Sequence, residues 1–413
     1  MIKKIRRWIA FIYLVPIIWM AFEPSRVMPF FRIPFIGYIV AMVALVLVSN
    51  RYLMRNEFWL AFIYGFVVFL NFRVGNVAFP SFFSVLYEIF RLLVPAAIFF
   101  YYRNNRNKLF VNVVLLAYIF IILFEALATY RLEQEFPGLM RNLSASRYDE
   151  ERVLFMQMGL APYSLPHALP TLLPAVILVL KDQNNRLIYR ILSIVFLVAS
   201  FIIIYLSQAT GAYLMAVFSL VLAMIVDSRG VQNNIRKLVI VFSLVVPFAI
   251  IPSFTNAVLD IAEMVVSTES DVYEKIEEVR ASNSGIDADG DIAYRGELLG
   301  KTIDTIIQHP LLGSRTKTYG NHNGLIDRWA KLGLVGFLPL LLFLTITIKN
   351  TYKIIPDKGK TYYVVGVISA IIMLSFKNQV SWDQWFLLFY LLPVLIIENY
   401  GYGGLKKTEQ LSS

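Results

Sequence analysis

Apolar runs of about 15 to 20 residues recur along nearly the whole chain, and this feature most constrains how it can fold. A transmembrane helix needs about 20 predominantly apolar residues, whereas the strands of a membrane barrel are short segments of alternating polarity. Hydrophobic residues make up 58% of the chain and charged residues 16%, while soluble domains have roughly a half and a quarter. The sequence therefore predicts an all-α, polytopic membrane protein.

About twelve membrane spans are expected. They are placed at roughly 8–22, 34–49, 58–71, 82–101, 109–128, 162–180, 188–206, 209–226, 237–255, 325–348, 361–376 and 383–398. The first span follows a cluster of basic residues and resembles a signal peptide. No small-residue cleavage site follows it and further spans do, so we expect a retained helix. The chain has no cysteine, which excludes disulfides, thiolate chemistry and cysteine-based metal sites.

The distribution of charge predicts the orientation in the membrane. With the N-terminus inside, Lys and Arg far outnumber acids in the inside segments, and acids outnumber bases in the outside segments. The positive-inside rule then places both termini in the cytoplasm. The net charge of +10 needs no nucleic-acid partner, because cytoplasmic loops beside anionic lipid account for it.

The chain is expected to form a single integral membrane domain, 1–413, with two long outer loops at about 129–161 and 256–324. The later loop contains a predicted helix at about 292–308, whose apolar residues cover one broad face and favour a position on the membrane surface. The sequence "QHPLLG" ends this helix, because Pro310 and Gly313 stop it. Long outer loops on a polytopic protein indicate a function at the outer face.

The predicted span 162–180 contains a proline at every fourth position. Pro162, Pro166, Pro170 and Pro174 each remove a backbone donor and crowd the preceding turn. Irregular backbone at membrane depth is tolerated where it is packed in protein or lines a wet cavity. One interpretation places this segment, with His167, beside an outward-facing cavity. The alternative is that the first two prolines lie in the loop and the span begins near Leu169.

Two charged features have both a structural and a functional interpretation. Arg91 lies near the middle of span 82–101, where a charge costs roughly 2.5–3.5 kcal/mol, so it should face the bundle or a cavity. Glu88, one turn earlier, could neutralise it, or Arg91 could contact substrate. The sequence "DADGD" places acids as a calcium loop does, but Ile292 and Leu298 stand where that loop needs Gly and Glu. We expect an acidic turn and no metal site.

The stretch "YRGELLGKTIDTIIQHPLLGSRTKTYGNHNGLIDRWAKLGLVG" resembles the signature of the O-antigen ligase and Wzy polymerase superfamily. Its matching pieces are Arg295, "HPLLG" at 309–313, the pair His322-Asn323, and the Gly-x-x-Gly of Gly333 and Gly336. A second stretch, "LMRNLSAS" with Arg141, resembles an earlier outer loop of capsule and exopolysaccharide polymerases. One departure is Thr210, which stands where many relatives carry an arginine.

The resemblance implies a metal- and cofactor-independent glycosyltransferase at the outer face of the bacterial plasma membrane. Its substrate would be an oligosaccharide on undecaprenyl pyrophosphate, which it would polymerise into a surface polysaccharide such as O-antigen, capsule or exopolysaccharide. His322 would act as the base toward an acceptor hydroxyl, and Arg295 would stabilise the leaving pyrophosphate. The expected substrate-binding residues are Arg141, Asn323, Asp327, Arg91 and His167. A chain-length regulator is the candidate protein partner under this resemblance.

Each of these residues also has a structural interpretation. His322 could cap the following helix, Arg295 could be a surface arginine, and Asp327 could pair with Arg328 or Lys331. Two other functions also stay open. A ligase that moves finished glycan to another acceptor would share the donor and the His-Arg pattern. A flippase or transporter is disfavoured, because polar residues concentrate in one late outer loop rather than near the midplane.

Overall fold

The computed structural model describes residues 55–74, 82–105, 108–145, 154–182, 185–226, 237, 260, 291–314, 324–376 and 382–400. Within these ranges all regular secondary structure is helical, so the all-α prediction is confirmed for them. Continuous or interrupted helices occupy nine of the predicted spans. The predicted spans 8–22 and 34–49, and almost all of 237–255, lie outside the described residues.

Three of the described helices are long and apolar enough to cross a membrane: α7 (Lys108–Glu135), α12 (Leu187–Leu206) and α18 (Gly324–Tyr352). Shorter apolar segments occur in α5 (Asn56–Val74) and in α13 (Thr210–Ile225). These helices support a membrane protein. The count of twelve spans and the orientation of the chain remain predictions.

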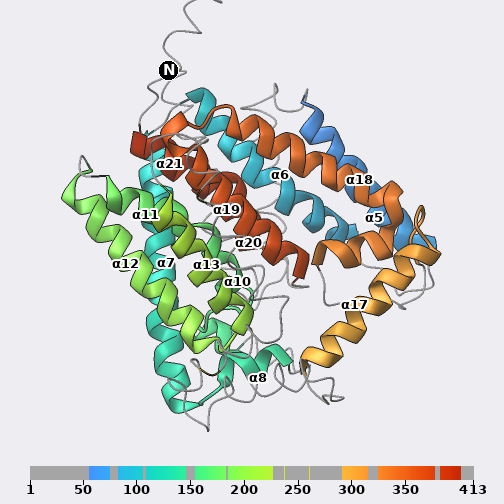
Figure 1. Cartoon of the computed structure of the whole chain (residues 1–413), viewed down its shortest axis with the longest axis horizontal. Coiled ribbons are helices and arrows are strands. Elements are labelled where there is room, and N and C mark those ends of the chain that lie inside the picture. Colours follow the sequence, from blue (N-terminus) through green and yellow to red (C-terminus); the bar gives the residue numbers. More distant parts are fainter. Residues whose placement is uncertain are drawn as a thin grey trace, which may run out of the picture.

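One group of helices consists of α5, α6 (Phe82–Asn105) and α18, which pack side by side (Figure 1). Small residues allow the close approach within this group. A Cβ atom added at Gly336 of α18 would lie 2.9 Å from Val67 Cγ1 of α5. Tyr64 of α5 is buried, and its hydroxyl accepts a hydrogen bond from the Arg328 guanidinium of α18 at 2.5 Å. The N-terminal half of α18 is therefore fixed to α5 by both packing and a polar contact.

The proline-rich span is interrupted and packed inside the protein, which agrees with the first interpretation of its backbone, and the outward-facing cavity beside it stays a prediction. It consists of α10 (Leu165–Ala168), the 3-10 turn η1 (Leu169–Thr171) and α11 (Leu173–Lys181). Each of these segments has a proline in its first two positions, where a missing N–H costs least. The hydroxyl of Ser219 donates to the Pro170 carbonyl at 2.8 Å, and Gln384 Nε2 donates to Thr171 Oγ1 at 2.8 Å. Neighbouring helices thus supply polar partners where the backbone departs from a regular helix.

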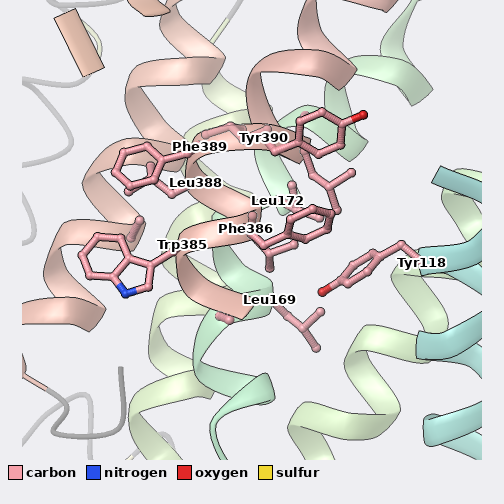
Figure 2. Packing of buried hydrophobic residues seen from close by; sticks show 14 of the residues in the cluster. Tyr118, Leu169, Leu172, Trp385, Phe386, Leu388, Phe389 and Tyr390 are labelled. Atoms are coloured by element: carbon pink, nitrogen blue, oxygen red, sulfur yellow. The ribbon is translucent and has the colours of Figure 1, made fainter. Parts of the chain in front are cut away.

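The last described span is buried along most of its length. It consists of α20 (Trp382–Phe386), the π-helix η2 (Leu387–Leu391) and α21 (Leu392–Tyr400), and every residue from 383 to 394 is buried. Figure 2 shows its aromatic side chains beside Leu169, Leu172 and Tyr118. The Phe386 ring lies 5.7 Å from the ring of Tyr118 of α7, between centroids. This span therefore joins α7 to the proline-rich span in the core.

A lysine stabilises the predicted cytoplasmic ends of two neighbouring helices. Lys181, the last residue of α11, donates from Nζ to the carbonyls of Ala223, Met224 and Val226 at 2.9, 2.7 and 3.0 Å. These carbonyls belong to the end of α13, where the helix dipole is negative. The Tyr362 hydroxyl of α19 (Asp357–Phe376) also donates to the Val226 carbonyl, at 3.1 Å. The end of α13 is thus fixed to two other helices.

Candidate functional site

Helix α17 (Asp291–Gln308) confirms the helix predicted at 292–308, and it packs against α18. Its sequence is amphipathic, and the face toward the protein buries Leu298, Thr302 and Thr305. Ile303 and Ile307, by contrast, are exposed, with 45% and 71% of their surface accessible. The exposed apolar side chains agree with the predicted position of this helix on the membrane surface, because lipid would cover them.

The contact between α17 and α18 contains a buried polar pair. Thr302 is fully buried, and its Oγ1 donates a hydrogen bond to Asp327 Oδ1 at 2.7 Å. Asp327 itself is only 6% exposed, in the first turn of α18. A carboxylate at a helix N-terminus interacts favourably with the helix dipole, and a hydrogen bond offsets part of the cost of its burial. Asp327 therefore lies in the helix interface.

The predicted turn "HPLLG" docks directly onto α18. Three backbone hydrogen bonds join the two segments: Ser314 N to Ala330 O at 2.8 Å, Leu334 N to Pro310 O at 2.8 Å, and Val335 N to Leu311 O at 3.1 Å. The bonds from Leu334 and Val335 use amides that a continuous helix would direct to its own preceding turn. The turn therefore occupies a break in the membrane helix.

Two glycines with positive φ make this docking possible. Gly333 has φ 62° and ψ −175°, which is a conformation that essentially only glycine adopts, and it divides α18 into two helical segments. Gly313 has φ 72°. A Cβ on Gly333 would overlap the carbonyl of Leu311, and a Cβ on Gly313 would overlap the carbonyl of Lys331. We call the docked segments, Pro310–Ser314 and Ala330–Val335, the glycine lock.

The glycine lock unites two parts of the signature that are separate in sequence. The "HPLLG" piece ends at Gly313, and the Gly-x-x-Gly piece begins at Gly333. Sequence reasoning used both as markers without predicting that they touch. The signal was present in the two glycines, since a glycine within a turn and another within an apolar helix both indicate close backbone approach.

The two residues expected to carry the chemistry are only partly described. Arg295 belongs to α17, seven residues before Thr302, but its side chain lies outside the described part of the structure. His322 and Asn323 also lie outside the described residues, and α18 begins at the next residue, Gly324. The helix that contains Arg295 therefore packs against the helix that follows His322-Asn323.

Arg141 is partly exposed in the short helix α8 (Leu139–Ala145). The Glu133 carboxylate fixes the start of α8, because it accepts hydrogen bonds from Gly138 N and Met140 N, both at 2.7 Å. In Figure 1, α8 and the N-terminal end of α17 both lie at the lower edge of the molecule. The elements that carry Arg141 and Arg295 thus lie toward the same end of the helix bundle.

His167 lies in α10 with only 3% of its surface exposed, and its ring meets the Tyr163 ring edge-on at 5.3 Å. The same segment contacts α7, because Ala161 N donates to Thr129 Oγ1 at 2.8 Å. Helix α10 also packs against α20. The structure therefore places His167 in the bundle interior.

Sequence reasoning missed two buried acids in this interior. Glu125 of α7 is 1% exposed and Asp383 of α20 is 3% exposed. An acid within an apolar run is costly in a membrane, and this signal could have identified both residues. Arg91 belongs to α6, but its side chain is outside the described part. Among the described residues, no three His, Asp or Glu side chains gather closely enough to hold a metal ion.

Comparison with known protein families finds a similarity in the middle and late parts of the chain. Residues 194–341 match the family model described as O-antigen ligase. The predicted resemblance to the O-antigen ligase and Wzy superfamily is therefore confirmed, and the matched range includes α17, the glycine lock and the segment of α18 before Gly333. No curated protein and no solved structure matches the chain.

Proposed function

We propose that this chain is a membrane glycosyltransferase of the Wzy type that polymerises oligosaccharide repeat units carried on undecaprenyl pyrophosphate. The match of residues 194–341 to the O-antigen ligase family supports the class of enzyme. The observation that best supports the location of the site is the glycine lock. It connects α17, which contains Arg295, to α18, which begins directly after His322-Asn323.

In the proposed reaction, His322 accepts the proton of an acceptor sugar hydroxyl. The hydroxyl oxygen attacks the anomeric carbon of the donor sugar and forms the new glycosidic bond. The bond between that carbon and the undecaprenyl pyrophosphate oxygen breaks, and its electron pair leaves with the pyrophosphate. Arg295 and Arg141 stabilise the negative charge on this leaving group, and the imidazolium later releases its proton to water.

The remaining candidates bind the glycan or orient the reactants. Asn323 follows the proposed base directly and can donate or accept a hydrogen bond to sugar hydroxyls. Arg91 and His167 come from the spans that would surround a cavity below the outer face, and Asp327 lies one turn into α18. The site needs no metal, because the arginines carry the leaving-group charge. The reaction takes place at the outer face of the plasma membrane, where the lipid of the donor and its sugar chain are both within reach.

Substitutions of His322 and Arg295 test the proposed roles. His322→Ala and His322→Gln should both abolish polymer at unchanged protein level, because neither side chain is a comparable base. Arg295→Lys should lose much of the rate and Arg295→Ala more, since lysine lacks the forked guanidinium. Loss of one such stabilising donor costs roughly a hundred- to a thousandfold in rate. Matched controls are His309→Gln at the exposed turn and Lys301→Gln on the exposed face of α17, which should stay active.

A ligase is the second candidate, because the matched family description names that activity. The glycan that accumulates in a knockout distinguishes the two functions. Loss of a polymerase leaves single repeat units on lipid in the outer leaflet, whereas loss of a ligase leaves long polymer on lipid. A flippase knockout would instead trap single units in the inner leaflet. Long lipid-linked polymer in the knockout strain would rule out the polymerase.

A further inference from the structure

We infer that Thr302 and Asp327 are positioning residues that set the angle between α17 and the outer segment of α18. They would thereby set the separation of Arg295 from His322, so this inference rests on the proposed function. Asp327 then acts through the Thr302 hydrogen bond and need not touch the glycan.

The first anchor point is the glycine lock, which follows the last residue of α17. By itself it joins the two elements at one end and leaves α17 able to pivot. The second anchor point is the 2.7 Å hydrogen bond from Thr302 Oγ1 to Asp327 Oδ1. Thr302 precedes the end of α17 by six residues, which is about 9 Å along the helix axis. Two separated anchor points on one helix prevent rotation that a single one would permit.

Because Arg295 lies far along α17 from the glycine lock, a small rotation of this helix displaces it considerably. Arg295 precedes His309 by fourteen residues, or about 21 Å of helix. A rotation of about 5° about the glycine lock would move the Arg295 backbone by about 2 Å at this distance. Misplacement of a reacting group by about 1 Å can reduce the rate by about a hundredfold. The second anchor point is therefore needed for the rate even though it lies away from the reacting atoms.

The chemistry of the pair fits an interface contact. The Thr302 hydroxyl lies 3.0 Å from the Leu298 carbonyl in its own helix as well as 2.7 Å from Asp327 Oδ1. It has a single proton, and a carboxylate is the stronger acceptor of the two. Burial of both residues excludes competing water and makes the bond electrostatically stronger than it would be in water. Thr305, one turn on, is also buried, but its hydroxyl bonds to the Lys301 carbonyl of its own helix at 2.7 Å.

The different hydroxyl contacts of Thr302 and Thr305 provide a matched pair of variants. Each variant is assayed in membranes with lipid-linked oligosaccharide. Thr302→Val keeps the shape of the side chain and removes the hydroxyl, and it should reduce kcat about tenfold to a hundredfold with a smaller change in KM. Thr302→Ser should restore most of the rate. Thr305→Val removes a hydroxyl bonded only within α17 and should stay near wild type.

Asp327→Asn separates positioning from direct participation. The asparagine carbonyl can accept the same Thr302 hydrogen bond, so positioning predicts that this variant keeps most of the rate and the wild-type pH profile. Asp327→Ala should lose at least as much rate as Thr302→Val, and the double variant should lose no more than Asp327→Ala alone. An inactive Asp327→Asn beside a fully active Thr302→Val would overturn the inference, because Asp327 would then act directly.

A distance measurement tests the geometry without any assay of activity. The chain has no cysteine, so paired cysteines at the exposed positions Gly300 and Leu338 can carry spin labels. Thr302→Val should broaden the distance distribution between them, and Thr302→Ser should keep it narrow. An unchanged distribution in Thr302→Val would refute the second anchor point. If His322→Ala kept its activity while Thr302→Val broadened the distribution, the anchor would stand and the catalytic role of His322 would fail.

Discussion

Replacement of Gly333 by alanine should separate the "HPLLG" turn from α18. At φ 62° and ψ −175° an alanine is strained, which costs about 1–3 kcal/mol. Its Cβ would also overlap the Leu311 carbonyl, and that carbonyl cannot simply move, because it accepts the Val335 amide at 3.1 Å. Loss of this bond and of the Leu334–Pro310 bond adds about 0.5–1.5 kcal/mol each. The expected total destabilisation of the contact between α17 and α18 is about 2–6 kcal/mol.

The assay compares Gly333→Ala with Gly300→Ala in purified, detergent-solubilised protein. Gly300 lies on the exposed side of α17, has no heavy atom near its added Cβ, and has no positive φ. Alanine there should be neutral or stabilise the helix by about 0.5–1 kcal/mol. Gly333→Ala should lower the thermal unfolding midpoint, speed proteolysis after Gly313, and abolish polymer formation. A Gly333→Ala protein with the wild-type midpoint and wild-type cleavage would refute the description of the glycine lock.

Three further predictions concern orientation, metal and helix ends. A single cysteine at Asn142 should react with an impermeant reagent in intact cells and one at Asn104 should not; the reverse pattern would invert the predicted topology. Polymer formation should persist in chelator, and activity that vanished and returned with a divalent ion would revive the acidic turn 287–291 as a site. Lys181→Met should destabilise the protein by about 1 kcal/mol, because α13 loses its positive partner. Lys181→Arg should recover part of that loss, and an unchanged midpoint in Lys181→Met would show that the contact contributes nothing.

Local sequence signals predicted the helices well. Apolar runs located α5, α7, α12 and α13 closely, and Pro310 and Gly313 predicted where α17 stops. The proline spacing correctly indicated an interrupted span, because each proline acts on its own backbone turn. These features depend on neighbours in the sequence, and a single sequence contains that information.

Contacts across the chain could not be predicted in the same way. Thr302 and Asp327 are 25 residues apart, and no local signal in either stretch pairs them. Glu125 and Asp383 stand out in sequence as acids within apolar runs, but which helices pack around each of them could not be read from the sequence. The positions of His322 and Arg295 relative to each other stay a prediction, since both depend on side chains outside the described residues.

In the last span, the orientation of α20 relative to α21 depends on how many residues the π-helix contains rather than on which residues they are. Five residues, Leu387–Leu391, form a turn that is one residue wider than an α-helical turn. Removal of one residue would restore α-helical geometry and rotate α20 by about 100° relative to α21. Gln384 would then leave Thr171, which it contacts at 2.8 Å, and the buried acid beside it would turn toward other neighbours. Deletion of a single leucine should thus disrupt the packing of α20 against its neighbours more than most substitutions in the same turn.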